Sequence, residues 1–276
     1  MPHNPYDIIC EILGQPAAQM PNPANEHYLC PFKNAVCSKR NHRSDAPFPV
    51  CSIFRRAKNT IPATPVIICP KRLYAADIYN DVITHCWPYS KPKHPIIVHE
   101  IKMGTVGNVD MVIADLSTDK LDISNFVSIE LQAIDTTGSY EPAYTSIVLN
   151  SALDKRPTYS FNYKNVQKRL VSQLINKGFY HHHWETKLIA VVQDVIYENI
   201  KTSIDFPEVE IANSNIIFMQ YQMILGGDDS EHRYELKLKN VTGTTHSHLM
   251  MSSLYKIAPP KKDFCARIMK QYQAGQ

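Results

Sequence analysis

The segment Val127-Ser128-Ile129-Glu130-Leu131-Gln132-Ala133-Ile134 guides the interpretation of the rest of the chain. Successive side chains of a β-strand point to opposite faces, so a period of two divides this segment into two sets. One set is apolar (Val127, Ile129, Leu131 and Ala133), and the other is polar (Ser128, Glu130 and Gln132). A carboxylate and an amide therefore stand side by side on a strand that is otherwise apolar enough for a core. This placement is unusual and directs attention to other acidic residues nearby.

Further strands are predicted on either side of this segment. Runs rich in β-branched residues, bounded by glycine and polar turns, predict strands at 96–103, 108–115, 125–134, 187–197, 215–225 and 232–240. The last two are expected to be joined by a turn at 226–229. Together these strands predict a sheet with the 125–134 segment near its centre.

Helical periodicity is clearest between Tyr163 and Lys177, where an apolar stripe recurs every three or four residues (Val166, Leu170, Val171, Leu174 and Ile175). Gly178 is expected to stop this helix. Shorter helices are predicted within 1–20, from 71 to 79 and at 263–272, and residues 138–163 are expected to form a polar connection. The pattern favours an α/β or α+β fold around a mixed sheet.

Composition limits the possible functions only weakly. The chain has 276 residues, 44% of them hydrophobic, and a formal net charge of +3. It contains no apolar run of the roughly 18–20 residues that span a bilayer and no signal-like N-terminus, so we expect a globular cytoplasmic protein without a membrane partner. The small net charge neither requires nor excludes a polyanionic partner.

Seven cysteines indicate metal binding better than disulfides, because their number is odd and no secretory signal is expected. Cys30, Cys37, Cys51 and Cys69 fall in a proline-rich segment with little periodicity, which a tetrahedral zinc or iron site would stabilise. Unrelated buried cysteines are the alternative, and Cys10, Cys86 and Cys265 are interpreted in that way. We therefore predict two parts: 1–75, with an N-terminal helix and a four-cysteine metal-binding segment, and 76–276, a catalytic core.

Carboxylates on adjacent predicted strands suggest a second kind of metal site. Asp110 lies about 20 residues before Glu130, and Gln132 follows two positions later. Hard oxygen ligands of this kind suit Mg2+, with coordination positions left for water and a phosphate oxygen. The spacing is the skeleton of the PD-(D/E)-x-K nucleases, with glutamine in place of the usual lysine. The alternative is that Asp110 sits at a turn and Glu130 on a partly solvated strand.

Several separate stretches resemble the NotI family of type II restriction endonucleases. The cysteine-containing stretches are 30–37, 50–53 and 68–70; the others are Gly107-Asn108-Val109-Asp110, 129–133 and the helix from Tyr163 to Gly178. The likeness spans about residues 26–185, and the shared order of these motifs makes it specific.

The resemblance implies a function and a role for each matching residue. Asp110 and Glu130 would bind the catalytic Mg2+, Gln132 would stand where related nucleases have lysine, and Glu100 would be an additional acidic residue. Cys30, Cys37, Cys51 and Cys69 would hold one structural iron. The fold would be a PD-(D/E)-x-K restriction-endonuclease-like core, with a mixed central sheet flanked by helices and a small four-cysteine knuckle.

The same resemblance predicts cleavage of double-stranded DNA at a specific, GC-rich palindromic site by a two-fold symmetric homodimer. The candidates for DNA contact are Lys155, Arg156, Lys164, Lys168 and Arg169. His181, His182 and His183 are interpreted as a polar loop after the helix, because consecutive side chains diverge. The competing hypothesis is a metal-stabilised, sequence-specific DNA-binding protein that has the nuclease fold without cleavage activity.

Overall fold

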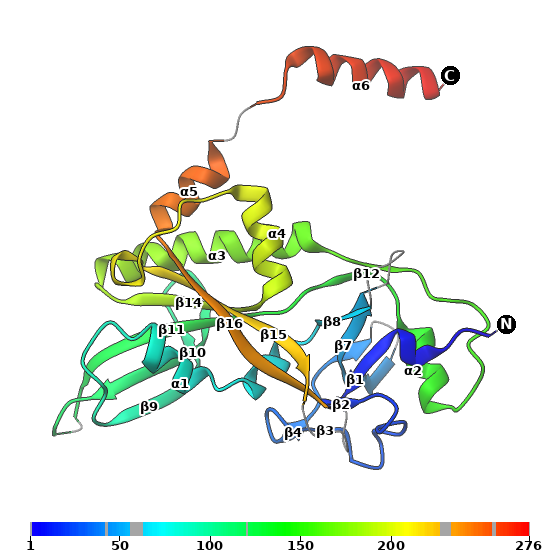
Figure 1. The fold of residues 1–276 in the computed structure, drawn as a ribbon, viewed down its shortest axis with the longest axis horizontal. Coiled ribbons are helices and arrows are strands. Elements are labelled where there is room, and N and C mark those ends of the chain that lie inside the picture. The colour runs from blue at the N-terminus through cyan, green and yellow to red at the C-terminus, as the bar shows by residue number, and fades with distance from the viewer. Residues whose placement is uncertain are drawn as a thin grey trace.

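The computed structural model describes residues 2–41, 44–55, 63–119, 121–226, 233–255 and 258–275. A central mixed sheet carries helices on both faces, and a smaller sheet from the first third of the chain lies beside it (Figure 1). The mixed α/β fold with flanking helices is therefore confirmed.

The central sheet has six strands in the order β16-β15-β14-β11-β10-β9. They are β9 (Pro95–Lys102), β10 (Asn108–Leu116), β11 (Ile123–Gln132), β14 (Lys187–Gln193), β15 (Ile216–Leu225) and β16 (Tyr234–Thr244). β9, β10 and β11 form an antiparallel meander, whereas β11, β14 and β15 run parallel. β16 returns antiparallel along the edge. The predicted strands are confirmed, although 187–197 ends as a strand at Gln193; residues 227–229 of the predicted turn lie outside the described residues.

Both faces of β14 are buried, which explains its continuous apolar sequence. One face packs on α3 (Tyr163–His183), α4 (Asp194–Ile204) and α5 (His246–Leu254), which lie together on one side of the sheet in Figure 1. The other face packs on the 3-10 helix η2 (Pro70–Ala75) and on α1 (Ile78–His85).

The N-terminal segment forms a four-stranded sheet instead of the helix predicted within residues 1–20. Its order is β2-β1-β7-β8, from Gln15–Pro16, Ile9–Ile12, Val50–Arg55 and Thr64–Ile67. All four residues of β1 are buried, so both faces of the strand are covered. The isoleucine spacing that suggested a helix therefore reflects a strand with two buried faces, and a short 3-10 helix (η1, Pro5–Asp7) precedes it.

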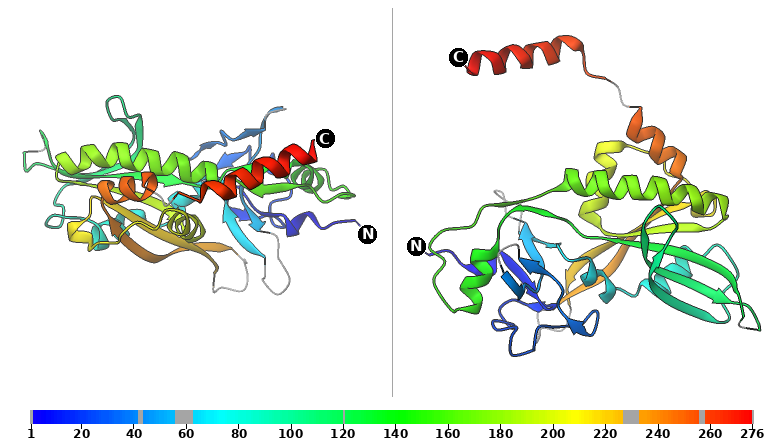
Figure 2. Two further views of the ribbon diagram at one scale, coloured as in Figure 1. Left: turned by 90° about the horizontal axis from the view of Figure 1, so that it is seen from above. Right: turned by 180° about the vertical axis from the view of Figure 1, so that it is seen from behind.

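The remaining elements are short or peripheral. They are β3 (Leu29–Cys30) with β4 (Ala35–Val36), β5 (Arg40–Asn41) with β6 (Ser44–Pro47), β12 (Thr136–Gly138) with β13 (Tyr159–Phe161), α2 (Glu141–Val148), η3 (Ile211–Asn213) and α6 (Lys261–Ala274). α2 interrupts the stretch that was expected to be only a connection. α6 confirms the helix expected at 263–272; it stands apart from both sheets (Figure 2) and buries none of its residues.

Helix α3 is longer than predicted, because Gly178 does not end it. A Cβ atom at Gly178 would come within 2.9 Å of Ile216 Cδ1 and His246 Cβ, so this glycine allows α3 to approach β15 and α5 closely. The helix continues to His183, and the three histidines occupy its last turn rather than a loop.

One hydrophobic cluster runs from the first sheet to α3 and includes Ile8, Ile53 and Leu170. The division of the chain between residues 75 and 76 stays a prediction. Within the described ranges, no helix is long and apolar enough to cross a membrane.

A buried ion pair joins the two sheets. Arg72 of η2 lies 2.9 Å from Glu11 of β1, with side chains 3% and 0% exposed. Glu11 also accepts a hydrogen bond from Ser52, and Arg72 donates to the main-chain carbonyl of Tyr234 at the start of β16 (2.7 Å). Each buried charge is therefore matched by partners from distant parts of the chain.

We predict that Arg72→Met lowers the free energy of unfolding by about 3–5 kcal/mol, because Glu11 would remain buried without its cation. Urea unfolding monitored by circular dichroism measures this change. Lys237→Met is the control, since Lys237 and Glu235 form an exposed pair at 3.5 Å that is expected to contribute less than about 1 kcal/mol. Equal effects of the two substitutions would contradict the prediction.

Candidate active site

Asp110 lies where strands β10 and β11 separate. Their main-chain pairing runs as far as Met111 and Ile129, and at the next position Asp110 Oδ2 accepts a hydrogen bond from the Leu131 amide (2.8 Å). The side chain thus takes the place of a main-chain acceptor at the end of the ladder. Asp110 is half-buried rather than placed at a solvated turn, and it lies next to the β11 segment that carries Glu130.

Glu130 is buried against a lysine from helix α3. The residue is 5% exposed, and its Oε1 atom lies 2.5 Å from Lys177 Nζ. Lys177 is itself 1% exposed and also donates to the main-chain carbonyl of Asn108 (2.5 Å). A charged pair from β11 and α3 is therefore anchored to β10 immediately beside Asp110.

Burial controls the protonation of both acids. Removal from water raises the pKa of Glu130 to about 7; the hydrogen bond and charge of Lys177 oppose this rise, and the Asp110 charge adds to it. Burial also raises the pKa of Asp110, against the Leu131 amide and the charge of Lys177. Two neighbouring carboxyl groups that both resist ionisation form a site to which a cation would bind favourably.

Glu100 and Gln132 complete the set of residues expected from the sequence. On β9, Glu100 falls between the paired positions Val109–Ile101 and Met111–His99, which places it across from Asp110. Its charge is one of the causes that raise the pKa of Asp110, and its φ of 57° marks an irregular point in the strand. Gln132 is buried two positions after Glu130, and its amide nitrogen donates to the Ala133 carbonyl. The four residues lie on three adjacent strands.

Two lysines and a tyrosine near the acids were not anticipated from the sequence. Lys33 Nζ lies 4.5 Å from the ring centroid of Tyr74, and its charge acts to lower the pKa of Asp110. Burial, followed by the charges of Asp110 and Glu100, raises the pKa of Tyr74 to about 12. Lys33 belongs to the cysteine-containing segment, so that segment reaches the edge of the acidic site. The sequence did contain a signal for Lys177. It falls seven residues after Leu170, on the apolar face of α3, where a lysine is expected to be buried.

The four cysteines of the predicted knuckle come from separate elements but act on one another. Cys30 ends β3, Cys37 follows β4, Cys51 lies in β7 and Cys69 precedes η2. Burial is the largest cause that raises the pKa of the Cys37 and Cys51 thiols; the charge of Cys69 adds to both, and that of Cys30 adds to Cys37. These effects link Cys37 to Cys30 and Cys69, and Cys51 to Cys69.

All seven cysteines are free thiols, and in the part of the chain that the structure describes no three His, Cys, Asp or Glu side chains are arranged as a metal site. Cys10 and Cys86 are buried as expected. Cys265 is exposed on α6, so its interpretation as a buried cysteine was wrong.

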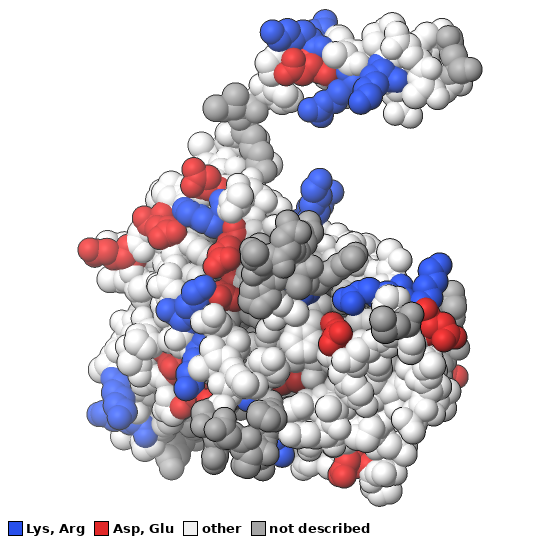
Figure 3. Space-filling model, turned by 45° about the vertical axis from the view of Figure 1, so that its right-hand side comes forward, with Lys and Arg blue, Asp and Glu red and all other residues white. Residues whose placement is uncertain are grey.

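The candidate DNA-contacting residues lie on the surface, apart from the half-buried Arg156. Lys164, Lys168 and Arg169 are exposed on α3, and Arg169 pairs with Asp135 at 3.1 Å. Lys155 and Arg156 line a cavity of about 630 Å³ beside α2. The face drawn in Figure 3 carries Lys and Arg in small groups with Asp and Glu between them, in keeping with the small net charge.

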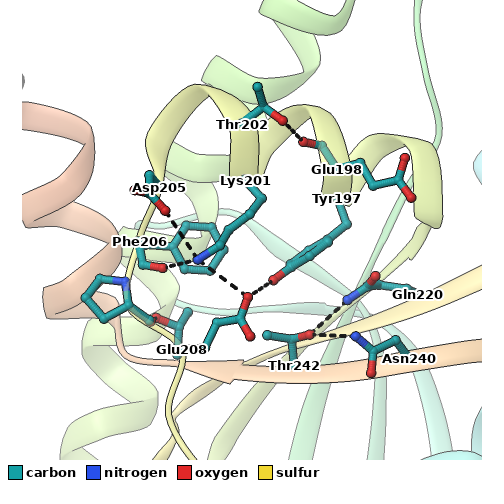
Figure 4. Close-up of polar contacts among 12 residues, drawn as sticks. Tyr197, Glu198, Lys201, Thr202, Asp205, Phe206, Glu208, Gln220, Asn240 and Thr242 are labelled. Atoms are coloured by element: carbon teal, nitrogen blue, oxygen red, sulfur yellow. Dashed lines mark hydrogen bonds and ion pairs between the residues drawn. The ribbon is translucent and has the colours of Figure 1, made fainter.

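A second polar cluster shows a different organisation. At the end of α4, Lys201 lies between Asp205 (3.7 Å) and Glu208 (3.4 Å), and Tyr197 donates to Glu208 (2.8 Å; Figure 4). The two carboxylates are 95% and 51% exposed, so water can hydrate them. This cluster therefore provides a solvated ion-pair network, whereas Asp110 and Glu130 are largely withdrawn from water.

The histidine run is divided by the helix. His181 is buried, its Nδ1 atom lies 2.8 Å from the Lys177 carbonyl oxygen, and burial lowers its pKa to about 4. His182 and His183 are exposed. The divergence expected for consecutive side chains is confirmed, on a helix rather than a loop.

Comparison with known proteins assigns the chain to a family. A family model described as "Restriction endonuclease NotI" matches residues 12–236, a wider span than the resemblance in the sequence motifs. The comparison with curated proteins found no match. The matched segment contains the four acidic-site residues, the four cysteines of the knuckle and Lys177. The chain therefore belongs to the NotI restriction endonuclease family and is, as a member of it, a site-specific deoxyribonuclease that binds double-stranded DNA.

Proposed function

We propose that the protein is a type II restriction endonuclease that uses Mg2+ to cut both strands of a GC-rich palindromic site. The observation that carries this proposal is the convergence of Asp110 and Glu130 where β10 and β11 separate. The order of elements supports a PD-(D/E)-x-K core: an antiparallel meander, a long helix, and a strand that returns parallel to β11. The acids come from the second and third strands of that meander.

Each carboxylate has one oxygen engaged by protein and one available. Asp110 Oδ2 is held by the Leu131 amide, and Glu130 Oε1 by Lys177. Within the described ranges no donor contacts Asp110 Oδ1 or Glu130 Oε2, so these two oxygens are the ones that would hold a cation. Mg2+ bound there would supply an acidified water and offset charge on the scissile phosphate.

The other site residues would orient water and substrate. Gln132 donates to the Ala133 carbonyl, and its amide oxygen can accept a hydrogen bond from a water aimed at phosphorus. Glu100 adds a third carboxylate on the β9 side, where a second cation or an ordered water would be held.

The same proposal gives the cysteines a structural role. Cys30, Cys37, Cys51 and Cys69 would hold one iron, with zinc as the other metal suited to four thiolates. Their mutual effects on pKa support a shared site. A metal there would fix the segment that carries Lys33 to the edge of the acidic site.

DNA would be bound by a homodimer, because a palindrome presents two identical half-sites. Lys155, Arg156, Lys164, Lys168 and Arg169 are proposed contacts to phosphates or guanine edges. The competing possibility is a protein that binds a specific sequence without cutting it. Retention of labelled DNA in Mg2+ with no fragment produced would favour that alternative.

We predict that Asp110→Asn and Glu130→Gln each reduce cleavage at least about 1,000-fold, since loss of metal assistance removes several kcal/mol of transition-state stabilisation. Initial rates on supercoiled plasmid in Mg2+ measure the effect, and EDTA should abolish the wild-type activity. Glu185→Gln is the control, because Glu185 is exposed beyond the end of α3. Near-normal cutting by either site variant would show that these carboxylates are not the ligands.

The pKa of Glu130 predicts how the metal requirement depends on pH. Below about 7 a proton occupies Glu130 and must leave before Mg2+ binds, so the half-saturating Mg2+ concentration should rise about fivefold from pH 7 to pH 6. Above pH 7.5 it should level off. Mg2+ titrations of the cleavage rate at pH 6, 7 and 8 measure this, and a requirement that is the same at pH 6 and 7 would contradict it.

We predict close to one iron or zinc per chain by elemental analysis of the purified protein. Cys51→Ser should lower this content and the unfolding temperature, because one thiolate of the proposed site is lost. Cys265→Ser should change neither, since Cys265 is exposed on α6. Wild-type protein with neither metal would remove the proposed knuckle.

A further inference from the structure

Lys177 occupies a position in which a lysine needs an explanation. It lies on the inward face of α3, in line with Leu170 and Leu174, and only 1% of its surface is exposed. A buried ammonium group loses much of its hydration, and the loss is tolerable only where acceptors replace the water. Lys177 finds two of them, Glu130 Oε1 and the Asn108 carbonyl, both at 2.5 Å.

The main chain around Lys177 fixes how far its side chain reaches. Gly178 allows α3 to contact Ile216 and His246, and its carbonyl accepts a hydrogen bond from Asn215 (2.7 Å). The Lys177 carbonyl lies 2.8 Å from His181 Nδ1. The ammonium group is therefore delivered to Glu130 from a helix that is held tightly against the sheet.

The two strands beside it lack a cation of their own at this point. Position 132, on the same face of β11 as Glu130, is a glutamine. Among the ion pairs of the described residues, Lys177 is the cation that contacts Glu130, and its charge also acts on Asp110. The positive charge that position 132 does not provide thus reaches Glu130 from α3.

We propose that Lys177 is a positioning residue for DNA cleavage: it replaces, from helix α3, the charge that a lysine at position 132 would supply. This proposal rests on the function proposed above. Lys177 is too buried to reach the phosphate, so it acts through Glu130. It holds Oε1 and so fixes the orientation of the carboxylate, and its second hydrogen bond, to the Asn108 carbonyl, ties β10 to β11 at the site.

The decisive experiment exchanges the positions of the lysine. Lys177→Met should lower kcat for plasmid cleavage about 100-fold while leaving KM for DNA unchanged, a loss typical of removing one preorganised charged donor. Adding Gln132→Lys to that variant should raise kcat at least tenfold above the value for Lys177→Met alone. Because Gln132 itself belongs to the site, the double variant is also compared with Gln132→Lys alone, and in that background Lys177→Met should lower kcat by no more than about tenfold. Wild-type kcat for Lys177→Met, or no recovery in the double variant, would overturn the proposal.

Lys187 provides a matched control. It is also a buried lysine, 4% exposed, but its ammonium group binds the main-chain carbonyls of Ile211 and Ser214 (both 2.6 Å) on another part of the sheet. Lys187→Met should therefore lower the unfolding temperature without lowering kcat in assays run well below that temperature. Equal loss of kcat in the two methionine variants would mean that any buried lysine matters, and would overturn the specific role of Lys177. If Lys177→Met fails to fold, Lys177→Gln, which keeps a donor without charge, replaces it.

A measurement without metal or DNA separates this proposal from the function itself. In EDTA, the unfolding temperatures of Lys177→Met, Glu130→Gln and their double variant form a cycle, and the double variant should lose less than the sum of the single losses. The Lys187→Met and Glu130→Gln pair should be additive. Additive losses for Lys177 and Glu130 would overturn the proposed pairing. A wild-type protein that never cuts would instead refute the proposed function.

Discussion

Strand β11 is hydrogen-bonded to β14 along one edge and, as far as Ile129, to β10 along the other, and its C-terminal half is buried, so bulk water reaches little of it. A carboxylate placed there must find charge or hydrogen bonds within the protein. Lys177 meets that demand for Glu130, and the separation of β10 from β11 meets it for Asp110 by freeing the Leu131 amide. The same burial that makes the strand a good core element therefore raises the pKa of Glu130 and of Asp110 on the neighbouring strand.

The part of this arrangement that depends on period and order could be predicted from the sequence. Alternation in β11 placed Glu130 and Gln132 on one face, and the turns around β10 brought Asp110 beside them. Lys177 was missed because lysine in an amphipathic helix is ordinarily a surface residue. Its burial depends on the close approach permitted at Gly178, and that depends on Ile216 and His246, which are distant in the sequence.

The N-terminal third was the least predictable part, for a related reason. Isoleucines at positions 8, 9 and 12 fit one face of a helix and equally fit a strand that is buried on both faces. The choice is made by residues later in the chain that pack in the same cluster: Phe48, between β6 and β7, Val50 of β7 and Val66 of β8. The cysteines could be grouped by composition, but no local pattern indicated the small sheet that includes Cys51.

The hydrogen bond from Arg72 to the Tyr234 carbonyl joins residues 162 positions apart, so the first sheet gains a partner only when β16 is in place. Contacts of such high sequence separation form late, because the chain between them must first be ordered. During synthesis the first strands leave the ribosome well before β16 does. The Glu11–Arg72 pair therefore lacks this acceptor, and the first sheet lacks its contact with β16, until most of the chain has been synthesised.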